Sequence, residues 1–127
     1  MSGRYFHGGF PGLRAGGLVL PPDATGTERT LSGIVAEHGG PAYAARRDVV
    51  YVTSLREAAR VYAAFYPDGA LYEVQPQGDL APDPDCLEPG ISWSCQAAEV
   101  LQVVDPVVLF RTRTPERWLR LLVRARE

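Results

Sequence analysis

Short strand-type runs, several of them closed within a few residues by glycine or proline, constrain the fold of this chain most. β-branched and aromatic residues favour the pleated, half-buried surface of a strand, whereas Gly and Pro end it. The clearest run is Asp48–Ser54, with the sequence DVVYVTS. Strand-type runs are predicted at Arg4–Phe6, Leu18–Leu20, Asp48–Ser54, Ala70–Gln75 and Ala98–Val108, the last broken at Asp105-Pro106. Ile91–Cys95 is predicted as a short strand or a turn.

One of these runs, Ala70–Gln75, alternates clearly between two faces. Successive side chains of a strand point to opposite sides of a sheet. Leu71, Glu73 and Gln75 therefore share one face, and Tyr72 and Val74 share the other.

Two helices are predicted, one in the middle of the chain and one at its end. The sequence S-L-R-E from Ser54 to Glu57 matches a capping box, so we expect Ser54 to cap the first helix. Pro67-Asp68-Gly69 ends that helix. Thr114 followed by Pro115 is typical of the start of a second helix. Its apolar side carries Trp118, Leu119, Leu122 and Val123.

These helices do not alternate with the strands, which favours an α+β fold with short, mostly antiparallel strands over a doubly wound sheet. A length of 127 residues fits a single domain, 1–127.

Charge and hydropathy exclude several classes of partner. A net charge of −2 gives no general basic field, so wholesale nucleic-acid binding is not indicated. No apolar run approaches the roughly 20 residues of a membrane span. No charged and then apolar leader opens the chain, so we expect a cytoplasmic protein, with reduced thiols at Cys86 and Cys95. Those cysteines form no C-x-x-C pair, so we expect no metal, and a redox pair is the alternative to two reduced thiols.

The polar segment Asp23–Arg47 is long for a connection inside a small domain. Such segments are usually functional or mobile. Leu31–Ala36 and Ala42–Arg47 each favour a helical turn or two. We interpret the segment as a substrate-facing loop with a little helix; a helical excursion with no role is the alternative.

No familiar cofactor motif is present: the chain has no G-x-G-x-x-G, no G-K-[ST], no H-E-x-x-H and no G-x-S-x-G. Three polar groups remain as candidates. They are His7, expected where the first strand stops before Gly8-Gly9, then Tyr51 or Thr53-Ser54, and the Asp83-Pro84-Asp85 loop. Taken singly, each also has an ordinary structural explanation, as a satisfied histidine, a core aromatic and a turn.

Together, the short blocks of this sequence resemble the rifamycin ADP-ribosyltransferase family of bacteria. The blocks are FHGG, GGLVLP, VVYVTS before an Ala-rich helix, YEVQPQG, DPD, SWSC and EVLQVV, in the family's order from about residue 4 to residue 104. The resemblance implies a small ADP-ribosyltransferase-like fold, with strands in two sheets, a central helix and a C-terminal helix. It also implies a glycosyltransferase that uses NAD as co-substrate, without a metal, in antibiotic resistance.

The resemblance further implies a catalytic set of His7, Tyr51 and Asp83, with Asp85 as the near alternative to Asp83. A carboxylate at Asp83 stabilises the positive charge that develops on the ribose as nicotinamide leaves. The Tyr51 ring stacks on nicotinamide, and the His7 imidazole bonds a ribose hydroxyl.

The same resemblance implies further NAD-binding residues. Gly8 and Gly9 leave room for the dinucleotide. Thr53 and Ser54 bond the nicotinamide ribose or simply cap the helix, and Ser92 and Trp93 line the nicotinamide pocket or belong to the core.

Several positions depart from the family's pattern. Gly9 stands where the family has Thr, Gly17 where it has Asp, Gln75 where it has Glu, and Asp85 where it has Asn. The segment between Pro22 and Asp48 does not match members that bind rifamycin. NAD chemistry is therefore better supported than a rifamycin acceptor.

Three functions remain open on the sequence. The first is a monomeric mono-ADP-ribosyltransferase whose acceptor is a rifamycin hydroxyl, another small molecule, a nucleic-acid end or a protein. The second is an RNA 2′-phosphotransferase, for which Arg4, Arg14, Arg46 and Arg47 are the candidate phosphate ligands. The third is a non-catalytic module that binds NAD or ADP-ribose.

Overall fold

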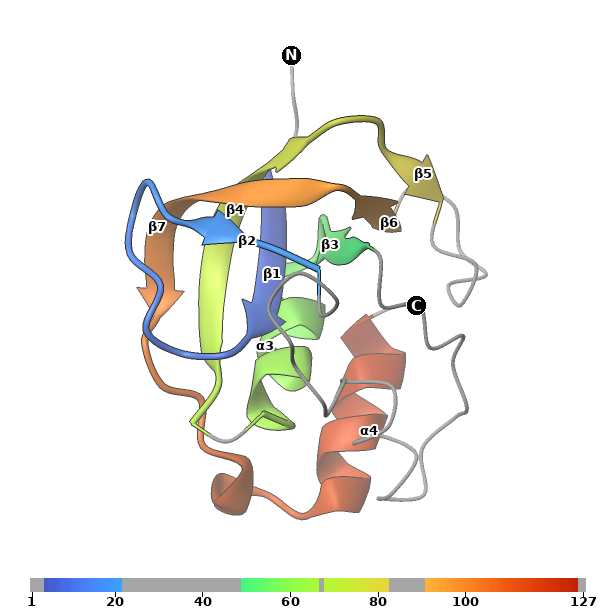
Figure 1. Cartoon of the computed structure of the whole chain (residues 1–127). Coiled ribbons are helices and arrows are strands. Elements are labelled where there is room, and N and C mark those ends of the chain that lie inside the picture. The colour runs from blue at the N-terminus through green and yellow to red at the C-terminus, as the bar shows by residue number, and fades with distance from the viewer. Residues whose placement is uncertain (1–3, 22–48, 67, 83–90, 126–127) are drawn as a thin grey trace.

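The computed structural model describes residues 4–21, 49–66, 68–82 and 91–125, which form one antiparallel sheet and two α-helices (Figure 1). The helices are α3 (Arg56–Ala64) and α4 (Pro115–Ala125), with a short 3-10 turn at Phe110–Thr112. The sheet has the order β2-β7-β4-β1-β3-β6-β5. Its strands are β1 (Tyr5–Gly9), β2 (Leu18–Val19), β3 (Val50–Thr53), β4 (Ala70–Gln77), β5 (Ala81–Pro82), β6 (Ser92–Cys95) and β7 (Ala97–Asp105).

This architecture confirms the α+β class, but the described strands form one sheet where we expected two. Among the described strands, β1 and β3 have the fewest paired positions. β1 and β3 share a single paired position, Phe6 opposite Thr53, whereas β1 and β4 are paired along all of β1. The two central strands therefore diverge beyond Phe6.

Both helices pack on one face of the sheet, which we call the helix face. Phe6 and Leu71 point from β1 and β4 into a core with Ala59, Trp118 and Leu122. Figure 1 shows α3 and α4 side by side beneath the strands. The Trp118 indole N–H donates to the Phe110 carbonyl at 2.7 Å, which fixes α4 to the 3-10 turn.

The opposite face, which we call the open face, carries a second core that no described helix covers. Its buried members include Val52, Tyr72, Val74 and Val100, with Leu13 packed against them. Leu71 thus lies in one core and Tyr72 and Val74 in the other, which confirms the alternation predicted for this strand.

The first strand corrects an expectation about His7. We expected the strand to stop there, but β1 continues through Gly8 and Gly9, which pair with Leu71 and Ala70 of β4. A Cβ at Gly8 would lie 2.0 Å from the Ala59 carbonyl oxygen of α3. The glycine therefore serves the close approach of a strand and a helix instead of a turn.

The start of α3 corrects a second expectation. The residue at the N-cap position is Leu55, not Ser54, and no side chain caps the helix. The Leu55 N–H donates to Thr53 Oγ1 at 3.1 Å, and the Ser54 hydroxyl donates to the Ile91 carbonyl at 3.4 Å. The Ser54 hydroxyl is thus directed to the residue before β6 and not to the end of α3, so the capping-box prediction is wrong.

The C-terminal helix follows its predicted start. Thr114 Oγ1 accepts the Arg117 N–H at 3.2 Å, the bond of an N-cap residue. Trp118 and Leu122 are buried as predicted, but Val123 is 60% exposed. Leu119, as predicted, and Leu121 pack partly buried against the same core, so the packed side of α4 includes Leu121 in place of Val123.

Several predictions lie outside the described residues: the whole segment Asp23–Arg47, the Asp83-Pro84-Asp85 loop, and Cys86. Cys95 is a buried free thiol, and burial raises its pKa. Neither described helix is long and apolar enough to cross a bilayer.

Candidate functional site

The site is built around His7, in the middle of β1 on the open face. Its Nδ1 lies 2.8 Å from the main-chain carbonyl oxygen of Tyr51 in β3. Burial lowers the pKa of the imidazole below its usual value, and the bond to the Tyr51 carbonyl partly opposes that shift. The ring is therefore neutral at pH 7, and since a carbonyl only accepts, the proton is assigned to Nδ1. Nε2 is then a hydrogen-bond acceptor.

Gly9 lies beside that acceptor. A Cβ at Gly9 would lie 2.6 Å from His7 Nε2, so the ring occupies the space that any other residue would need. A threonine here, as in the resembled family, would push the imidazole away from the position described. Glycine at this position thus leaves the space that the His7 ring occupies in its observed orientation.

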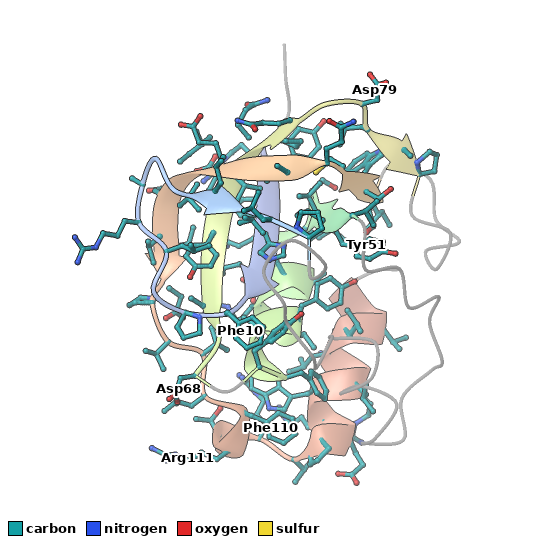
Figure 2. All side chains as sticks on the ribbon, in the orientation of Figure 1. Phe10, Tyr51, Asp68, Asp79, Phe110 and Arg111 are labelled. Atoms are coloured by element: carbon teal, nitrogen blue, oxygen red, sulfur yellow. The ribbon has the colours of Figure 1, made fainter. Side chains whose placement is uncertain are left out.

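The structure does not bring the His7 and Tyr51 rings to the same face. Val50 and Val52 of β3 belong to the open-face core, so by strand alternation the Tyr51 side chain leaves on the helix face (Figure 2). His7 and Tyr51 meet instead through the Tyr51 carbonyl, at the point where β1 and β3 diverge.

Thr53, Ser54 and Ser92 make main-chain contacts around the start of α3. Thr53 Oγ1 donates to the Ile91 carbonyl at 2.8 Å, and the Ser92 hydroxyl donates to the Val52 carbonyl at 3.4 Å. Thr53 and Ser92 are buried and opposite each other in the β3–β6 register. These bonds support a structural role in joining β3 to β6.

Trp93 shares the open face with His7. It is paired with Val52 in the β3–β6 register and packs edge-on against Tyr5 of β1, with ring centroids 5.4 Å apart. Pro82, the last residue of β5, lies opposite Trp93, and Asp83 follows Pro82 directly in the sequence. The positions of Asp83 and Asp85 themselves are outside the described residues.

Sequence reasoning missed a contribution from Tyr72. This tyrosine is fully buried and lies directly opposite His7 in the β1–β4 register. Its hydroxyl donates to the Phe10 carbonyl at 2.6 Å and accepts the Leu13 N–H at 3.3 Å. The sequence indicated only which face of β4 carries Tyr72. It could not indicate the partners of the hydroxyl, because these are main-chain groups.

Arg4, a candidate phosphate ligand, already forms an ion pair with a carboxylate. Its Nε and Nη2 donate to the two oxygens of Glu73 at 2.9 and 3.1 Å. Gln102 donates to the same carboxylate at 2.6 Å, and the Arg4 and Gln102 bonds lower the pKa of Glu73.

The described residues hold no group of three or more His, Cys, Asp or Glu side chains suited to a metal ion. Comparison with protein-family models and with curated proteins gives no match to this chain.

Proposed function

We propose that this protein is an NAD-dependent mono-ADP-ribosyltransferase. The observation that carries the proposal is the His7 imidazole, held neutral by burial and oriented by the Tyr51 carbonyl, with its acceptor nitrogen beside Gly9. A hydrogen-bond acceptor held in one orientation beside a glycine can accept from a ribose hydroxyl of a dinucleotide, because no side chain at the glycine blocks its approach.

In the proposed reaction, the bond between nicotinamide and ribose breaks and its electron pair leaves with nicotinamide. An acceptor hydroxyl bonds to the ribose carbon and releases its proton. His7 holds the ribose and Asp83 stabilises the positive charge on it. Tyr51 contributes through its main-chain carbonyl to the orientation of His7. Its ring lies on the helix face, so we do not assign it the stacking of nicotinamide at the open face.

The acceptor is a rifamycin-type hydroxyl or another small molecule, a nucleic-acid end or a protein. An RNA 2′-phosphotransferase is a weaker proposal, because Arg4 already forms a two-bonded ion pair with Glu73. Its remaining basic candidate among the described residues is Arg14, which is exposed in the β1–β2 connection.

The direct test is incubation of the purified chain with NAD and chromatographic measurement of free nicotinamide. Release with water or an added hydroxyl compound supports the transferase. Release only with a 2′-phosphorylated RNA supports the phosphotransferase instead. Saturable ADP-ribose binding without release identifies a binding module, and neither release nor binding rejects all three functions.

The carboxylate is tested by three matched Asp→Ala substitutions. Asp83→Ala should lower the rate of nicotinamide release about 100-fold or more, the effect of removing one electrostatic contact to a transition state. Asp79→Ala is the control, because Asp79 is exposed in the turn after β4 (Figure 2). Loss of activity in Asp85→Ala alone would move the role to Asp85. Full activity in both loop variants would reject a carboxylate from this loop.

A further inference from the structure

Tyr72 stands out among the described residues because it joins the strand opposite His7 to the chain that follows Gly9. It is the direct cross-strand neighbour of His7, with its side chain on the same face. Its ring is 0% exposed. A tyrosine is rarely buried so fully unless its hydroxyl has partners.

Both partners of this hydroxyl belong to one short turn, Phe10–Leu13. The hydroxyl donates to the Phe10 carbonyl at 2.6 Å and accepts the Leu13 N–H at 3.3 Å. Burial raises the pKa of the phenol, so the donor is retained throughout the neutral range. Within the turn, Gly12 has a φ of 95°, a left-handed conformation that favours glycine.

The turn starts at the residue after Gly9, whose main chain borders the acceptor nitrogen of His7. At its other end, Leu13 packs on the open-face core beside Tyr72. The path of the chain next to His7 is therefore fixed at Gly9 by the β4 pairing and at Phe10 and Leu13 by the Tyr72 hydroxyl.

We propose that Tyr72 is a positioning residue, whose hydroxyl holds the Phe10–Leu13 turn in place beside the His7 acceptor so that the turn forms one wall of the NAD site. The role rests on the function proposed above. It does not include contact between Tyr72 and NAD, because the phenol is covered by the turn that it holds.

Tyr72→Phe separates the hydroxyl from the ring. The substitution keeps the buried ring and removes both bonds to the turn. The matched control is Tyr5→Phe, which removes a hydroxyl on the same face of β1 that makes no hydrogen bond within the described segments. Folding of both variants is checked by circular dichroism.

The first measurement is amide hydrogen exchange at Leu13 by NMR, without ligand. We expect exchange at Leu13 to be about tenfold faster in Tyr72→Phe, the effect of losing one or two net hydrogen bonds, and unchanged in Tyr5→Phe. Equal exchange in Tyr72→Phe and the unmodified chain would overturn the proposed restraint on the turn.

The second measurement is the kinetics of nicotinamide release. A displaced wall weakens NAD binding, so KM should rise about tenfold while kcat stays within about twofold. A purely structural role predicts the reverse, because a smaller folded fraction lowers the apparent kcat and leaves KM unchanged. That reverse pattern would overturn the proposal while leaving the transferase intact. An unmodified chain that neither releases nicotinamide nor binds ADP-ribose would overturn both.

Discussion

The two faces of β1 differ in what they demand of the sequence. Phe6 and Gly8 point to the helix face, where Phe6 is buried in the core and Gly8 lies against the main chain of α3. His7 and Gly9 point to the open face, where a polar ring lies over a glycine. One strand of five residues therefore carries packing on one side and the candidate site on the other.

The difference between the two faces means that glycine is required at Gly8 and at Gly9 for different reasons, although the two residues are adjacent. At Gly8 the obstacle to a side chain is main chain, the Ala59 carbonyl and the Ala63 nitrogen, which cannot move without moving α3. At Gly9 the obstacle is the end of the His7 side chain, which can rotate. Substitutions on the two faces should consequently affect different properties.

The largest effect is expected from Gly8→Ala. Its Cβ would lie 2.0 Å from the Ala59 oxygen and 2.6 Å from the Ala63 nitrogen, so β1 and α3 must separate. We expect the free energy of unfolding to fall by about 3 kcal/mol, at the upper end of overpacking costs. Urea denaturation followed by circular dichroism measures it. A loss below about 1 kcal/mol would mean that the strand and helix are less closely packed than described.

The second prediction is that the stability of the folded chain depends on pH through His7 on the open face. The unfolded chain protonates His7 near pH 6.5, whereas burial lowers the pKa of the folded imidazole. Between those two values the unfolded state binds more protons, so stability falls as the pH falls below about 6.5. The loss is at most about 1.4 kcal/mol per pH unit and ends below the folded pKa.

This pH dependence is measured as the difference between the unmodified chain and His7→Gln in urea denaturation from pH 7.5 downwards. His38 is present in both chains, so its own titration cancels in the difference. Parallel stability curves for the two chains would show that His7 is not held neutral by the fold.

Much of the fold could be predicted because its signals are local. The period of two in Ala70–Gln75 placed Leu71 and Tyr72 on opposite faces, and Thr114 before Pro115 located the start of α4. Each of these patterns lies within a few residues, where propensity and hydrogen bonding act directly.

The errors arose at positions whose conformation depends on contacts with a segment that is distant in the sequence. Gly8-Gly9 is a turn signal in isolation, but its pairing with Leu71 and Ala70 of β4 makes both residues part of a strand. Ser54 matches a capping pattern, yet its hydroxyl donates to the Ile91 carbonyl of a segment 37 residues further on. Tertiary contacts override local propensity at these positions.

The site was predicted as a set of side chains, but its best-defined contacts are to main chain. His7 bonds a carbonyl 44 residues away, and Tyr72 bonds two main-chain groups of the Phe10–Leu13 turn. A carbonyl has no sequence signature, so such partners become visible only in the folded chain. This is why His7 could be selected from the sequence while the reason for its orientation could not.

The smallest change in stability is expected from Gly9→Ala, the counterpart of Gly8→Ala on the open face. The nearest atoms to its Cβ all belong to the His7 ring, with Nε2 at 2.6 Å and Cδ2 at 3.2 Å. Because the ring can rotate, and because alanine loses less conformational entropy on folding than glycine, stability should stay within about 1 kcal/mol. The imidazole must nevertheless turn away from the Tyr51 carbonyl. We therefore expect the His7 nitrogen NMR shifts to lose the pattern of a single tautomer, and NAD binding to weaken about tenfold, by loss of one oriented hydrogen bond. A Gly9→Ala chain as unstable as Gly8→Ala would show that the two faces of β1 are not independent. A stable chain with an unchanged His7 spectrum would show that glycine at this position does not control the imidazole.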